Sequence, residues 1–177
     1  VDMSHSAEES TLQAIEISQR PIVISHANPT FFEPAKRNKS NKVLSALAES
    51  EGLLGFSMYP FHLKNGPQCG LDEFCPKAEQ TVDLMGIDRA GMGSDLCLDQ
   101  PLEVLEWMRN GRWTKQMDYG EGSASNAAWP ESLSWFETSA DFPNIVVGLR
   151  DKGFNEVEIE KIMGRNWLDF CAVGFGP

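Results

Sequence analysis

Short apolar runs separated by stretches of helical spacing fill the first half of this chain. The runs with the length of a buried strand span residues 1–5, 21–26, 53–59 and 90–95. The stretches with helical spacing span residues 6–20, 40–52 and 77–86. Strands that alternate with helices in this way are typical of βα units around a parallel sheet, so the pattern predicts an α/β fold.

The second half of the chain has few clear strands. Apolar positions at helical spacing predict helices at 101–111, 142–153 and 155–164. A segment of small residues at 120–127 is predicted to be a loop within the domain, because neither flank has the features of an independent domain. We therefore expect a single domain over residues 1–177.

Three of the four predicted strands end in a side chain that can bind a metal or transfer a proton, namely His5, His26 and Asp95. The carboxyl ends of parallel strands meet at one edge of a sheet, and neighbouring strands lie about 5 Å apart. Two imidazoles at that spacing can bind one zinc ion at roughly 2.0–2.1 Å. The third group, Asp95, suits either metal binding or proton transfer.

Arg37 lies in the loop after the second of these strands and has two readings. It belongs either to a solvated basic loop, since lysines surround it, or to a substrate site. In the second reading its planar guanidinium would bind a substrate carboxylate. A serine hydrolase is disfavoured, because Ser94 lacks the glycine that follows the nucleophile in the G-x-S-x-G elbow.

The composition of the chain excludes several classes of binding partner. A formal net charge of −11 argues against binding to nucleic acid or to an anionic membrane surface. No run approaches the roughly 18 apolar residues of a transmembrane segment. The four cysteines lack paired CxxC spacing, so a zinc site built on them is not expected. Cys69 and Cys75 are either a local disulfide or two reduced thiols.

The chain resembles the C-terminal half of the membrane dipeptidase (renal dipeptidase) family. The segments that carry the resemblance are VDMSH, PIVISHANP, RNKSN, GIDRAGMGSD, DFPNIVVGLRDKGF and EIEKIMGRNWL. It implies strands 5 to 8 of a (β/α)8 barrel with two zinc ions that hydrolyses dipeptides or small amides with a free carboxylate. By this resemblance His5 and His26 would bind one zinc, Arg37 the carboxylate of the substrate, and Asp95 its amino group or a transferred proton.

Several family features are absent from this sequence. No H-x-D pair, which holds the first zinc in the family, occurs, and Asn41 and Arg89 replace an acid and a histidine. We expect the N-terminal half barrel on a preceding segment or a partner chain, and a paired rather than monomeric polypeptide. The alternative is a catalytically inactive binding or scaffold half. Neither the cysteines nor the first residues distinguish a cytoplasmic from a periplasmic enzyme.

Overall fold

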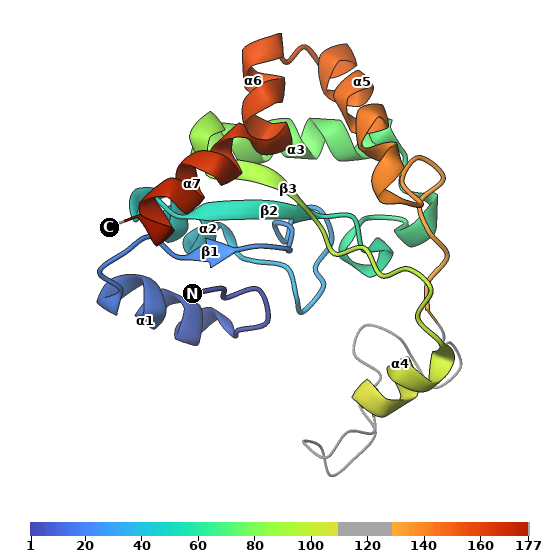
Figure 1. Cartoon of the computed structure of the whole chain (residues 1–177), viewed down its shortest axis with the longest axis horizontal. Helices are drawn as coiled ribbons and strands as arrows, with labels where there is room; N and C mark the ends of the chain where they lie inside the picture. The colour runs from blue at the N-terminus through green and yellow to red at the C-terminus, as the bar shows by residue number, and fades with distance from the viewer. Residues whose placement is uncertain (110–128, 177) are drawn as a thin grey trace.

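A parallel sheet lies at the centre of the fold (Figure 1). The structure is a computed structural model that describes residues 1–109 and 129–176. Within these residues the sheet has the order β1 (Val23–Ile24), β2 (Leu53–Ser57) and β3 (Ala90–Ser94). A single parallel bridge from Asp2 to Val23 adds the N-terminal segment beside β1.

Helices alternate with the strands, as the pattern of apolar positions predicted, and then follow one another in the C-terminal part. Their bounds are α1 (Glu8–Ile17), α2 (Asn41–Glu49), α3 (Leu71–Met85), α4 (Leu102–Arg109), α5 (Phe142–Lys152), α6 (Glu156–Glu160) and α7 (Asn166–Phe175). Figure 1 shows α4 standing away from the sheet, while α7 runs across it. The loop predicted at 120–127 lies outside the described residues. No helix of the described residues is long and apolar enough to cross a bilayer.

One face of the sheet packs on the hydrophobic core. Leu54 and Phe56 of β2 are fully buried, together with the apolar side of α2. The Phe56 ring lies 5.9 Å from the Phe32 ring and 5.8 Å from the Phe74 ring, measured between centroids. Side chains alternate between faces along a strand, so Gly55, between these two residues, points to the opposite face.

Glycines on that opposite face are approached closely by the start of α7 and by the Ser25 backbone. A Cβ atom on Gly91 would lie 2.7 Å from the Trp167 Nε1 atom, and one on Gly93 would overlap the Ser25 carbonyl oxygen. The Trp167 indole donates a 2.9 Å hydrogen bond to the Met92 carbonyl. Glycines are therefore required where the Ser25 backbone and the Trp167 ring approach the sheet so closely.

Some details differ from the sequence-based expectations. The N-terminal segment predicted as a strand forms only the bridge at Asp2. The helix predicted at 77–86 begins six residues earlier, at Leu71, and contains Pro76. Cys69 and Cys75 are buried free thiols, which resolves the open choice in favour of reduced cysteines, and burial raises the pKa of each to about 12.

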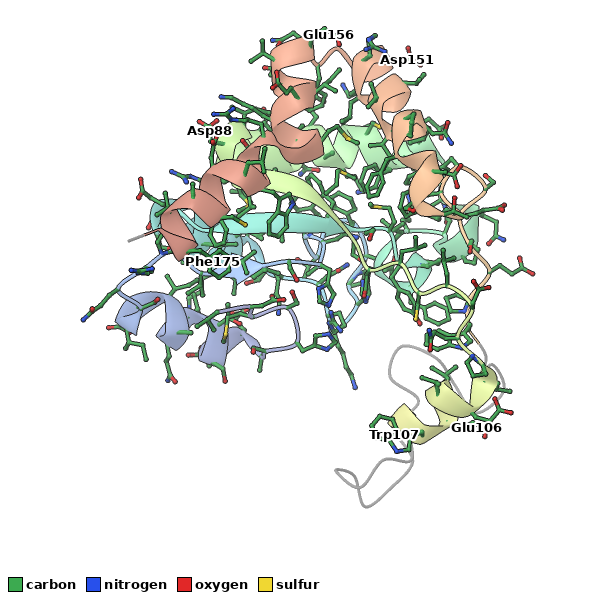
Figure 2. All side chains as sticks on the ribbon, in the orientation of Figure 1. Asp88, Glu106, Trp107, Asp151, Glu156 and Phe175 are labelled. Carbon is green, nitrogen blue, oxygen red and sulfur yellow. The ribbon has the colours of Figure 1, made fainter. Side chains whose placement is uncertain are left out.

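Apolar side chains are exposed along α7. Leu168, Val173 and Phe175 are between 60% and 85% exposed, and Phe175 projects from the end of the helix in Figure 2. Ile17, at the end of α1, is 79% exposed. The Arg20 guanidinium donates to the Gly174 carbonyl, so α7 lies close to the segment that follows α1.

Candidate functional site

The two predicted histidines meet at the carboxyl edge of the sheet. The Nε2 atoms of His5 and His26 lie 3.1 Å apart, and the ring centroids are separated by 5.1 Å. Partial burial, the Arg37 charge and the neighbouring His26 lower the pKa of His5. A lowered pKa favours the neutral imidazole, which is the form that binds metals.

Arg37 reaches this pair from the loop that follows β1. Its Nη1 donates to the His5 Nδ1 atom at 2.8 Å, and its Nη2 donates to the His26 carbonyl at 3.4 Å. Its Nε atom is buried and has no hydrogen-bond acceptor in the described part of the chain. The guanidinium therefore lies beside the histidines with one N–H unused, which does not fit a solvated basic loop.

A bulge at the end of β3 positions Asp95. The register changes from Phe56 opposite Met92 to Ser57 opposite Ser94, which leaves Gly93 as the extra residue. Ser94 and Asp95 then adopt left-handed backbone angles, with φ of 32° and 59°. Non-glycine residues in this region carry strain that clusters at functional sites.

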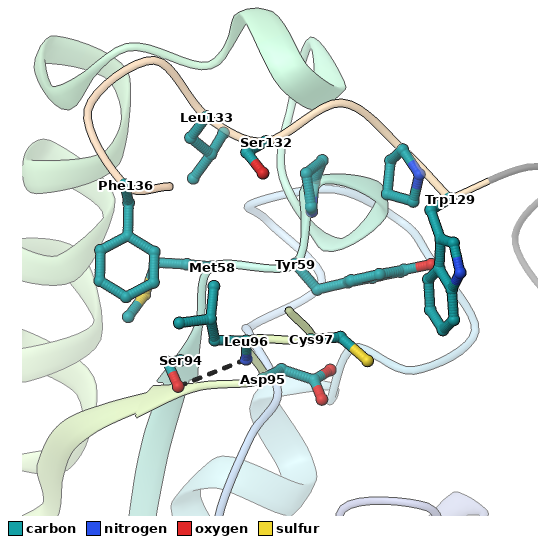
Figure 3. Close-up of a pocket in the computed structure, with 12 residues that line it drawn as sticks. Met58, Tyr59, Ser94, Asp95, Leu96, Cys97, Trp129, Ser132, Leu133 and Phe136 are labelled. Atoms are coloured by element: carbon teal, nitrogen blue, oxygen red, sulfur yellow. Dashed lines mark hydrogen bonds between the residues drawn. The ribbon is translucent and has the colours of Figure 1, made fainter. Parts of the chain in front are cut away.

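The Asp95 carboxylate lies between two histidines. Its Oδ1 atom is 3.9 Å from His26 Nε2, and its Oδ2 atom is 4.0 Å from His62 Nδ1. His62 is 1% exposed, and its Nδ1 lies 2.9 Å from the Ser57 hydroxyl. Asp95 also borders a pocket with largely apolar walls that include Tyr59 and Trp129 (Figure 3).

Asp2 accepts hydrogen bonds from both serines that precede the paired histidines. Its carboxylate accepts the backbone N–H and hydroxyl of Ser4, and likewise those of Ser25. Burial alone would raise the pKa of Asp2, but these hydrogen bonds outweigh it and lower the pKa to about 2. Asp2 is therefore ionised at neutral pH.

Lys39 anchors the turn that carries His5. Its ammonium donates to the carbonyls of Met3 and Ser6 at 3.1 and 2.7 Å, and the residue is 4% exposed. Burial and the neighbouring Arg37 charge lower the pKa of Lys39 to about 8. Its ordinary value, recovered on unfolding, is 10.5.

This pKa difference predicts a pH-dependent stability. Between pH 8 and 10.5 the unfolded chain keeps the Lys39 proton that the folded protein has lost, so the contribution of Lys39 to the unfolding free energy rises with pH. Cys69 and Cys75, whose pKa values are raised in the folded protein, act in the opposite direction but equally in both proteins. Urea titrations across this range should therefore show the wild type gaining stability relative to Lys39→Met as pH rises. Lys36→Met, at an exposed lysine nearby, should behave as the wild type. Parallel curves for the wild type and Lys39→Met would contradict the prediction.

The spacing of the histidine pair fits a zinc ion. Because His5 Nδ1 accepts from Arg37, its Nε2 carries the proton in the metal-free protein, and binding zinc there would require that proton to move to Nδ1 and Arg37 to turn away. Two nitrogens bound to one tetrahedral zinc at roughly 2.0–2.1 Å are separated by about 3.3 Å, close to the observed 3.1 Å. A zinc centre needs at least three protein ligands in most enzymes. Residues 1–109 and 129–176 contain no group of three or more histidine, cysteine or acidic side chains able to hold a metal. The pair alone therefore supplies fewer ligands than such a centre needs.

The structure thus brings His5, His26, Arg37 and Asp95 to one edge of the sheet, as expected from the strand ends for the histidines and Asp95 and from the family resemblance for Arg37. The roles of Asp2, Ser25 and Lys39 were not predicted. A signal for the serines was present, since Ser-His occurs twice, at 4–5 and 25–26. Lys39 carried no such signal, because its burial depends on the fold of the turn at residues 3–6.

Comparison with known proteins supports the same family. The membrane dipeptidase (peptidase family M19) model matches residues 1–109. Dipeptidase tcpJ of Claviceps purpurea is 23% identical over 167 residues, which cover 94% of this chain and 32% of that protein. The chain therefore spans about a third of the length of this curated relative.

Solved structures share the fold. An amidohydrolase from Pseudomonas aeruginosa is similar with a TM-score of 0.88 and 25% identity, over 99% of this chain and 52% of that chain. A metallopeptidase from Rhodobacter sphaeroides, solved with a phosphinate mimic of L-Ala-D-Ala, is similar with a TM-score of 0.74 and 20% identity, over 97% of this chain and 41% of that chain. With the family model matching more than half of its residues, the chain belongs to the membrane dipeptidase family, peptidase family M19.

Proposed function

We propose that this chain is the C-terminal half of a (β/α)8 barrel that hydrolyses dipeptides with zinc. In this proposal His5 and His26 bind zinc, Arg37 binds the substrate carboxylate, and Asp95 binds the amino group or transfers a proton. Zinc, when bound, activates water at neutral pH and polarises the scissile carbonyl. The observation that carries the proposal is the 3.1 Å convergence of the two histidine Nε2 atoms beside Arg37 and Asp95.

The remaining ligands and strands are proposed to come from an N-terminal half, on a preceding segment or a partner chain. The chain covers 52% of the amidohydrolase and 41% of the metallopeptidase structure. The exposed apolar side chains of α7 and Ile17 offer a surface that a second half could cover. Membership of the family and the ligand in the Rhodobacter structure support a dipeptide as the substrate.

Arg37 provides a test of substrate recognition. In the zinc-loaded protein with both halves present, Arg37→Gln is expected to lower kcat/KM for Ala-Ala about 100-fold, since losing a charged partner costs roughly 3 kcal/mol. Hydrolysis of Ala-Ala-amide, which lacks the free carboxylate, should be slow in the wild type and change little in the variant. Lys36→Gln, at the adjacent exposed cation, should leave both rates unchanged.

The outcomes distinguish the alternatives. An equal loss for the dipeptide and its amide would assign Arg37 to the support of His5 rather than to the substrate. A wild-type protein that holds zinc, binds dipeptides and hydrolyses none would favour the inactive binding half.

A further inference from the structure

The two Ser-His dipeptides of the chain are joined by one carboxylate. Asp2 Oδ1 accepts the Ser4 hydroxyl at 2.6 Å, and Asp2 Oδ2 accepts the Ser25 hydroxyl. The Ser4 oxygen in turn accepts the backbone N–H of His26 at 3.1 Å. The Asp2 carboxylate is therefore hydrogen-bonded to both of the serines that precede the histidines.

The direction of these hydrogen bonds fixes the protonation of His26. An ionised carboxylate only accepts hydrogen bonds, so Ser25 must donate its one hydroxyl proton to Asp2. The Ser25 oxygen, 2.7 Å from His26 Nδ1, is then left as an acceptor. His26 must supply that proton from Nδ1, which leaves the Nε2 lone pair directed toward His5.

We infer that Asp2 is a positioning residue that acts through the Ser25 hydroxyl to hold His26 in the tautomer whose Nε2 can bind a metal. This inference rests on the proposed zinc centre for its purpose, although the tautomer itself can be measured in the metal-free protein. Groups that orient a metal-binding histidine through its second nitrogen typically change metal affinity 10–100-fold when mutated.

Asp2→Asn changes which atoms donate and which accept in this hydrogen-bond network, while the side chain keeps nearly the same size and shape. Asp2 Oδ1 faces the backbone N–H groups of Ser4 and Ser25, at 3.0 and 3.1 Å. The amide oxygen of an asparagine must take this position, which places its NH₂ group against the Ser25 hydroxyl. Ser25 would then accept from the asparagine and donate to His26 Nδ1, and this moves the His26 proton to Nε2.

The experiment compares wild type, Asp2→Asn and Asp83→Asn, an exposed aspartate on α3. The tautomer of His26 is read from imidazole ¹⁵N chemical shifts of the metal-free protein, and Zn²⁺ affinity from calorimetric titration of the protein with both halves present. We expect Nδ1–H in the wild type and in Asp83→Asn, and Nε2–H with roughly 10–100-fold weaker zinc binding in Asp2→Asn. Nδ1–H together with wild-type zinc affinity in Asp2→Asn would overturn the inference.

A second pair of variants tests the inference independently, in case Asp2→Asn does not fold. Ser25→Ala leaves Asp2 in place and removes only the link, so His26 should populate both tautomers, and Ser25→Thr should restore Nδ1–H. No difference between these two variants would also overturn the inference. If the tautomer inverts in Asp2→Asn but the wild type binds no zinc, control of His26 by Asp2 stands and the proposed metal centre fails.

Discussion

In the protein with both halves present, His26→Ala is expected to abolish stoichiometric zinc binding and to lower kcat/KM for a dipeptide by about 1000-fold or more. A zinc ion contributes several kilocalories per mole to such a reaction, and each 1.36 kcal/mol is tenfold in rate. His26 supplies one of the two nitrogens that lie 3.1 Å apart, so His5 alone would remain from the pair. Zinc content after dialysis and initial rates on Ala-Ala measure the two effects.

The loss should not come from unfolding. The His26 side chain is 20% exposed at the edge of the sheet and lies outside the hydrophobic core. Its alanine variant should unfold close to the wild-type urea midpoint, as should the control Gln80→Ala on the exposed side of α3. A folded His26→Ala protein that retains zinc and wild-type turnover would remove His26 from the metal centre.

Gly93→Ala is expected to destabilise the fold by roughly 3 kcal/mol, at the upper end of the usual cost of overpacking. The added Cβ would overlap the Ser25 carbonyl oxygen, which is backbone and cannot rotate away like a flexible side chain. Relief requires β3 to shift, and β3 carries the bulge that aims Asp95. Activity should therefore fall further than the loss of folded protein explains.

Gly174→Ala is the matched control for this variant. Gly174 lies near the end of α7, and a Cβ there would meet no atom within 4 Å. Alanine is favoured over glycine in helices by up to about 1 kcal/mol, so this change should be neutral or stabilising. Urea unfolding of both variants gives the comparison. A Gly93→Ala midpoint equal to that of Gly174→Ala would contradict the close approach at Ser25.

The local elements of the fold were largely readable from the sequence. Helical periodicity located α2, whose apolar positions match its buried side, and short apolar runs located the two longer strands, which are largely buried. The tail was only partly predicted. Gly164 was predicted to end a helix, and the backbone is non-helical there, but the continuation into α7 beyond this kink was not predicted. That continuation is stabilised by Asn166, whose amide donates to the carbonyls of Ile87 and Ala90, and no local pattern encodes such distant partners.

In the candidate site, too, the features set by local sequence were predicted and those set by distant contacts were not. His5, His26 and Asp95 were predicted because each follows an apolar run, and parallel strands bring such ends together. The hydrogen bonds of Asp2 could not be predicted, since they depend on the register that places Asp2 beside Val23. The backbone angles that turn Asp95 toward His26 likewise arise from a bulge that only strand pairing reveals.

Because α7 covers β3, the sheet can reach its final packing only late in translation. Trp167 and Asn166 bond to carbonyls of residues 87–92, which leave the ribosome much earlier. Domains fold as the chain emerges, but contacts of such long sequence separation form late. Until α7 is synthesised, the face of the nascent sheet that carries these glycines stays open to water and to other chains. Chaperone binding during translation is therefore expected to persist until residue 167 has emerged.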